Sequence, residues 1–189
     1  SIGNIINIRD ILNKTTPTIL RLLIAGGHYR SPLNYTNDLL ESAKNSANNI
    51  IKFLSTLDLI KTSRYQNIEI AEYLKKSSED FSDAMDDDFN TPKALASIFS
   101  LISAVEEDIW QISKTQAVQL KKFIRKQFSI LGIEIDSLLA PENIKELAEK
   151  REIFRQKKNF AAADELRRQV QKLGFEIEDT PVGPLIHLE

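Results

Sequence analysis

The stretch "MDDDFNTPKAL", Met85 to Leu95, places three consecutive acids before an aromatic residue and an Asn-Thr-Pro sequence. Three adjacent carboxylates are compatible with a metal site, with a docking surface or with the start of a helix. A helix N-terminus carries partial positive charge that stabilises nearby carboxylates, and proline is favoured in the first helical turn. We therefore predict that Asp86 to Pro92 form a helix start.

The residues around this acid run do not match a metal site. Residues 69–90 hold eight acids and two bases, but a hard cation needs about six oxygen ligands in a defined geometry. Adjacent side chains do not point to one centre, and the glycine and distant glutamate of an EF-hand loop are absent. The chain has no cysteine and only two histidines, His28 and His187. We predict no metal site and no catalytic residue in this chain.

Apolar residues recur at spacings of three and four along most of the first 131 residues, which indicates amphipathic helices. Thr16 and Pro17 have the residue types of a helix cap and first turn, and Thr91-Pro92 opens another helix. The predicted helices start at Thr16, run over 36–58 and 67–84, start at Thr91 and run over 116–131. Four or five such helices, packed antiparallel, form a bundle.

The pattern changes after Gly132, which we expect to end a helix. Pro141 is expected to begin another helix after a short connector, and Asn159 to cap the next one. Gly174 stands where a left-handed helix end belongs. Residues 175–186 alternate in hydropathy around a Pro/Gly turn, which predicts a β-hairpin.

The predicted fold class is mainly α: an antiparallel helical bundle followed by a small α+β module that ends in a β-hairpin. We place a short tail at residues 1–15, the bundle at 16–135 and the C-terminal module at 136–189. Hydrophobic residues make up 42% of the chain and charged residues 28%, with a net charge of −2. Because the sequence has no membrane-length apolar run and no leader, we expect a cytoplasmic protein without membrane contact. It begins with Ser1, so we expect it to be a fragment.

The terminal module has a charge of its own. Residues 142–172 hold nine basic and six acidic side chains, a net charge of +3. Arg151, Arg155 and Lys158 follow at steps of four and three, which predicts one helical face. Either a solvated helix face or a surface that follows phosphates explains this pattern, and charge alone does not decide between them.

Four stretches together resemble the C-terminal half of bacterial-type cysteinyl-tRNA synthetases. "SIGN" resembles the end of that family's KMSKS-type loop, and "HYRSPLNY" resembles its link into the helical bundle. "AMDDDFNTPKALA" resembles a distinctive internal stretch, and "KREIFRQKKNFAAADELRRQVQKLGFEIEDTPVG" resembles the terminal anticodon module. Their common order extends the resemblance over nearly the whole chain.

The resemblance implies a parent enzyme that activates cysteine with ATP and transfers it to the 3′ end of tRNA-Cys. ATP, Mg²⁺ and a zinc ion would belong to a catalytic domain preceding this segment, of which Ser1 is the edge of the KMSKS-type loop. It therefore implies no cofactor in the segment itself and no activity of the segment alone. The expected partner is tRNA-Cys, with no DNA, and the expected state is a monomer.

For this segment the resemblance implies recognition: the bundle braces the tRNA and the module reads the anticodon. Arginines suit phosphates or guanine, and carboxylates suit an amino donor of a base. Asp164 is alternatively a structural partner of Arg167. The predicted tRNA-binding residues are Arg30, Arg151, Arg155, Lys157, Lys158, Asp164, Arg167, Arg168, Asp179 and Thr180.

One departure from the family pattern concerns the hairpin. The family usually places a tryptophan after the hairpin glycine, whereas here Gly183 is followed by Pro184, Leu185 and Ile186. Two other functions stay open. One is the bundle of a related ligase that joins cysteine to an amino sugar, which typically lacks the terminal module. The other is a helical protein-interaction scaffold.

Overall fold

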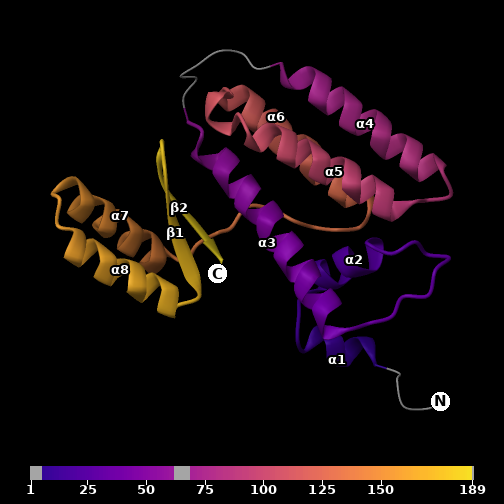
Figure 1. Cartoon of the computed structure of the whole chain (residues 1–189), viewed down its shortest axis with the longest axis horizontal. Coiled ribbons are helices and arrows are strands. Elements are labelled where there is room, and N and C mark those ends of the chain that lie inside the picture. Colours follow the sequence, from indigo (N-terminus) through magenta and orange to yellow (C-terminus); the bar gives the residue numbers. More distant parts are fainter. Residues whose placement is uncertain (1–5, 62–68, 189) are drawn as a thin grey trace. The chain divides into compact units, whose positions relative to one another are not determined.

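The computed structural model describes residues 6–61 and 69–188 (Figure 1). This part of the chain confirms the predicted mainly α fold with a terminal hairpin. Ser1 and Asn67, the predicted loop edge and helix start, lie outside it. In chain order the elements are α1 (Ile8–Leu12), α2 (Pro17–Ala25), α3 (Asn37–Leu59), α4 (Ile70–Asp86), α5 (Thr91–Glu106), the 3-10 helix η1 (Ile109–Gln111), α6 (Lys114–Ile130), α7 (Glu142–Gln156), α8 (Phe160–Lys172), β1 (Phe175–Thr180) and β2 (Gly183–Leu188).

The chain divides into two compact units. The first comprises residues 1–49, 69–107 and 122–135, and the second comprises 50–68, 108–121 and 136–189. The helices α3 and α6 contribute residues to both. The domain bounds predicted at residues 15 and 135 stay predictions.

In the first unit, α4 and α5 lie side by side (Figure 1). Both helices bury one apolar face, with Phe81 on α4 and Ile98 on α5 among the enclosed side chains. The buried hydroxyl of Ser77 donates a hydrogen bond to the carbonyl oxygen of Ser97 at 3.3 Å. This bond satisfies a polar group that burial between the two helices would otherwise leave without a partner.

The helix α2 begins and ends as its sequence predicts. The side chain of Thr16 accepts a hydrogen bond from the backbone N–H of Ile19, and Pro17 occupies the first turn. The helix stops at Ala25, before Gly26. Its inward residue Leu23 packs in a small apolar cluster with residues of α3.

The acid run forms a corner between α4 and α5. Asp86 is the last residue of α4, and Asp88 and Phe89 then adopt left-handed backbone angles, with φ of 55° and 51°. The side chain of Asn90 accepts a hydrogen bond from the backbone N–H of Lys93 at 3.3 Å, which caps α5.

The predicted helix start was therefore correct from Asn90 to Pro92 and wrong for Asp86 and Asp87, which end the preceding helix. The left-handed backbone angles of Asp88 and Phe89 turn the chain sharply between the two helices. Because the turn occurs at these two residues, α4 extends further into the acid run than the charge pattern predicts.

The terminal part of the second unit is a helical hairpin, α7 and α8, that packs against the hairpin of β1 and β2 (Figure 1). Its apolar core consists of Ile144, Ala148, Val170 and Ile177. Gly174 joins α8 to β1 with a φ of 81°, a left-handed conformation that glycine adopts without a side-chain clash. The structure confirms the predicted hairpin.

Polar contacts within the second unit hold the connector before α7. The hydroxyl of Ser55 accepts a hydrogen bond from the backbone N–H of Leu138 at 2.8 Å. The ammonium of Lys121 lies 2.8 Å from an Asp58 carboxylate oxygen and 3.2 Å from one of Asp136. The connector is thereby held directly by Ser55 of α3 and by Lys121 of α6, which also contacts Asp58 at the end of α3.

Across residues 6–61 and 69–188, no helix is both long enough and apolar enough to cross a bilayer.

Candidate functional site

A bidentate ion pair joins α7 to β1 in the terminal module. The guanidinium of Arg151 donates from Nη1 to Oδ1 of Asp179 at 2.6 Å and from Nη2 to Oδ2 at 3.0 Å. Arg151 is 2% exposed, whereas the Asp179 side chain is 43% exposed. One carboxylate is therefore held from inside the module and open to solvent on its other side.

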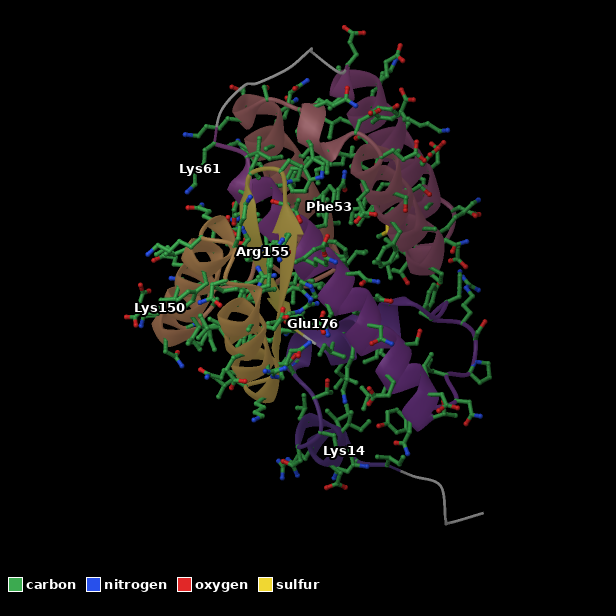
Figure 2. All side chains as sticks on the ribbon, turned by 60° about the vertical axis from the view of Figure 1, so that its left-hand side comes forward. Lys14, Phe53, Lys61, Lys150, Arg155 and Glu176 are labelled. Carbon is green, nitrogen blue, oxygen red and sulfur yellow. The ribbon has the colours of Figure 1, made fainter. Side chains whose placement is uncertain are left out.

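Two further arginines act electrostatically on the same carboxylate. Arg155, one helical turn after Arg151, places Nη2 3.3 Å from Oδ2 of Asp179. Figure 2 shows Arg155 on α7 close to the hairpin that carries Glu176. The hydrogen bond from Arg151 lowers the pKa of Asp179, and the positive charges of Arg151, Arg155 and Arg167 lower it further. Asp179 is consequently an anion at neutral pH.

The turn between α7 and α8 begins earlier in the chain than the sequence predicts. Arg151, Arg155 and Lys158 were expected on one helical face, but α7 ends at Gln156 and Lys158 has a left-handed φ of 58°. The prediction was wrong for Lys158 because helical spacing applies only inside a helix. Lys157 and Lys158 are both exposed in this turn.

The residue after this turn is an exposed aromatic that the sequence analysis missed. The side chain of Asn159 caps α8, as predicted, by accepting a hydrogen bond from the backbone N–H of Ala162 at 3.3 Å. Phe160 begins α8 and is 57% exposed. Its spacing puts it three residues before the buried Ala163, yet its own side chain is not enclosed in the core. An aromatic beside two lysines was the sequence signal that could have found it.

The other predicted tRNA-binding residues of the module differ in their exposure and in their contacts. Asp164 is exposed on α8 and acts electrostatically on Arg151. Arg168 is paired with Glu165 one turn earlier, at 2.7 Å. The hydroxyl of Thr180 donates to the carbonyl oxygen of Gly183 at 2.5 Å and thereby closes the hairpin turn. Thr180 therefore has a structural contact within the turn.

Arg30, the remaining predicted residue, belongs to the first unit. Its Nε lies 2.6 Å from Oδ2 of Asp88, whose Oδ1 accepts a hydrogen bond from the hydroxyl of Tyr29 at 2.6 Å. The rings of His28 and Tyr29 are stacked, with centroids 5.1 Å apart. The structure thus joins two stretches singled out in the sequence, "HYRSPLNY" and the acid run.

This cluster predicts how the stability of the first unit depends on pH. The hydrogen bonds from Tyr29 and Arg30 lower the pKa of Asp88. Its stabilising contribution is therefore present above the ordinary aspartate value of about 3.9 and is lost as the pH falls through the lower folded value. We expect Asp88→Asn to lower the free energy of unfolding at pH 7, with a difference from the unmodified chain that narrows below about pH 4.

Chemical unfolding across this pH range measures the effect. Asp80→Asn is the matched control, because it removes one negative charge from α4 and leaves the contacts of Tyr29 and Arg30 in place. A difference for Asp88→Asn that is the same at pH 3 and pH 7 would contradict the prediction.

Within the described ranges, no group of three or more His, Asp or Glu side chains is arranged to hold a metal ion. The carboxylates of the acid run diverge: Asp88 bonds Tyr29 and Arg30, whereas Asp87 lies 3.6 Å from the ammonium of Lys93. The partners of these acids are hydrogen-bond donors of the chain itself.

Two family models and several curated proteins are similar to this chain. Residues 1–45 match the family described as the class I (C) tRNA synthetase catalytic domain, and residues 80–136 match the DALR domain. The chain is 34% identical to the cysteine–tRNA ligase of Caldicellulosiruptor saccharolyticus over 191 residues, which cover 97% of the chain and 41% of that protein. It is 31% identical to that of Thermococcus onnurineus over 204 residues, which cover 98% and 42%.

A third relative, the cysteine–tRNA ligase of Lactobacillus delbrueckii subsp. bulgaricus, is 33% identical over 198 residues, which cover 97% of the chain and 41% of that protein. The chain thus spans about two fifths of the length of these relatives, and each alignment includes almost all of its own residues. The chain is therefore similar, over nearly all of its own length, to cysteine–tRNA ligases.

Proposed function

We propose that this chain is the tRNA-binding part of a cysteine–tRNA ligase and that its terminal module recognises the anticodon of tRNA-Cys. The observation that carries the proposal is the half-exposed carboxylate of Asp179, which has Arg155 3.3 Å away and is also under the influence of the positive charge of Arg167. This group lies on a module whose residues 142–172 carry a net charge of +3, in a chain with a net charge of −2.

The chemistry of this surface suits an unpaired RNA loop. Bases of a single-stranded loop are splayed out, so their hydrogen-bonding edges and ring faces are available. An arginine donates to the acceptors of guanine, and a carboxylate such as Asp179 accepts from the amino group of a base. The exposed ring of Phe160 offers a base a stacking surface, and Lys157 and Lys158 beside it offer charge to the phosphates.

Phe160 also offers an aromatic ring in place of the tryptophan that is missing after Gly183. A base can stack on an aromatic ring carried by any helix or strand, provided that the face of the ring is exposed near the other RNA-binding residues. We propose that Phe160 supplies that face from the start of α8.

In this proposal the first unit braces the tRNA, and the exposed guanidinium of Arg30 is the group that contacts the RNA. Aminoacylation of tRNA-Cys by the whole protein is part of the same proposal, because the relatives that align with nearly all of the chain are named cysteine–tRNA ligases.

The affinity of the chain for tRNA-Cys, compared with the same tRNA carrying a changed anticodon, tests the proposal at fixed salt. We expect tRNA-Cys to bind more tightly. Arg167→Ala should reduce that preference by about 1–3 kcal/mol, because a base-edge contact is lost. Lys158→Ala should weaken both RNAs alike and reduce the salt slope by about 0.7, because a phosphate contact carries no sequence information.

The two variants serve as controls for each other, since each removes one positive charge from the same module. An unmodified chain that binds both tRNAs equally would refute anticodon recognition. An equal effect of Arg167→Ala on both tRNAs would instead assign Arg167 to phosphate contacts.

A further inference from the structure

Arg151 is a charged residue inside a small apolar module, a place where an apolar residue is the more usual choice. A buried ion pair loses much of its attraction to desolvation, and apolar residues of similar volume often replace such pairs without loss of stability. Arg151 is 2% exposed, and its Nε has no hydrogen-bond partner. Its two terminal nitrogens, by contrast, both reach Asp179.

The geometry of the pair fixes the carboxylate of Asp179. Two parallel hydrogen bonds, at 2.6 and 3.0 Å, orient the plane of the carboxylate, whereas a single contact would allow it to rotate. Each carboxylate oxygen can accept more than one hydrogen bond, so acceptor capacity remains on the exposed side. The Asp179 carboxylate thus has the properties of a binding group whose orientation is fixed in advance by a supporting residue, here Arg151.

We propose that Arg151 is a positioning residue: it makes no contact with RNA and orients Asp179 to accept a hydrogen bond from the amino group of an anticodon base. The inference rests on the proposed function, since it concerns the same surface. It assigns Arg151 a part in specificity, in place of the phosphate contact predicted from the sequence. Burial explains the change, because a guanidinium enclosed in the module cannot reach a phosphate.

The charged groups around Asp179 come from two helices. Arg151 and Arg155 face it from α7, Arg167 acts on it from α8, and Asp164 on α8 acts on Arg151. The neighbour of Asp179 on β2 is a proline, which is uncharged. The hydrogen bond from Arg151 has the largest effect on the pKa of Asp179, so a substitution at Arg151 should change that pKa measurably.

The test is Arg151→Lys, which keeps the charge and loses the two-nitrogen contact. A base-edge contact contributes between about 5-fold and 150-fold to affinity for the correct base. We expect the variant to lose most of the preference for tRNA-Cys over the anticodon-changed tRNA and to keep its salt slope. Arg21→Lys in the first unit is the matched control for the substitution and should retain the preference.

Two measurements separate positioning from a general structural role. NMR titration of the Asp179 carboxyl should show its pKa raised in Arg151→Lys toward the ordinary value of about 3.9. In an Asp179→Ala background, Arg151→Lys should cause no further loss of preference, because the group on which it acts is gone. Amide exchange of α8 and β1 monitors the fold throughout.

A preserved preference in folded Arg151→Lys would overturn the inference, and so would a further loss in the Asp179→Ala background. Should the lysine variant unfold, Asp179→Glu keeps both charges and displaces the carboxylate by one methylene. We then expect a similar loss of preference, and full preference in that variant would overturn the inference. A preference near one in the unmodified chain would instead refute the proposed function.

Discussion

Replacing Ile177 by alanine is expected to unfold the terminal module. Ile177 projects from β1 into an apolar core that it shares with Ile144, Ala148 and Val170. Removing a buried isoleucine side chain to its Cβ costs about 2–5 kcal/mol, from lost burial and the cavity left behind. Whole domains are stable by only about 5–15 kcal/mol, and small ones lie toward the lower end. A core of this size does not tolerate such a loss.

Hydrogen exchange of the amides of α8 and β1 measures this effect directly. We expect their protection to fall to that of an unfolded segment in Ile177→Ala, together with the preference for tRNA-Cys. Ile153→Ala is the matched control, because Ile153 is an isoleucine of α7 in the same module that is 49% exposed. Equal protection in the two variants would contradict the assignment of the module core.

Replacing Phe160 by alanine is expected to weaken tRNA binding by about 1–3 kcal/mol, the contribution of one base stacked on an aromatic ring. Its exposed ring at the start of α8 has little packing to lose, so the fold should remain intact. Phe160→Trp should retain or improve the affinity, because it keeps a flat ring at the same position. Titration of labelled tRNA-Cys at fixed salt gives the comparison.

Leu173→Ala provides the control for loss of an exposed apolar side chain. Leu173 lies just after the other end of α8 and is 52% exposed, close to the exposure of Phe160. We expect its substitution to leave the affinity unchanged. Equal losses for Phe160→Ala and Leu173→Ala would show that the ring of Phe160 has no special contact with RNA.

Much of the fold could be predicted because its signals are local. Thr16, Asn90 and Asn159 each accept a hydrogen bond from the backbone N–H three residues ahead in their helices, and for Thr16 and Asn159 the residue type predicted that role. Gly174 adopts the left-handed conformation that its place after a helical pattern predicts. The alternation of hydropathy in residues 175–186 predicted the hairpin before any contact was known.

The errors arose where the backbone leaves regular geometry. Asp88, Phe89 and Lys158 adopt left-handed angles although none is a glycine, and no pattern of spacing or charge indicates this. At the acid run the result is a corner at which Asp88 contacts Tyr29 and Arg30, 59 and 58 residues away in sequence. At the end of α7 it removes a lysine from the predicted helical face.

The helices, two of their caps, the hairpin, the charge of the terminal module and the family resemblance could all be predicted from the sequence, because each depends on residues close together in the chain. Which charges remain available depends on the tertiary packing. Arg151 and Arg155 are one helical turn apart and look alike in sequence, yet one is enclosed against Asp179 and the other is partly open to solvent. Burial depends on how α7 packs against β1, 28 residues further on, and that packing is not a local property of the chain.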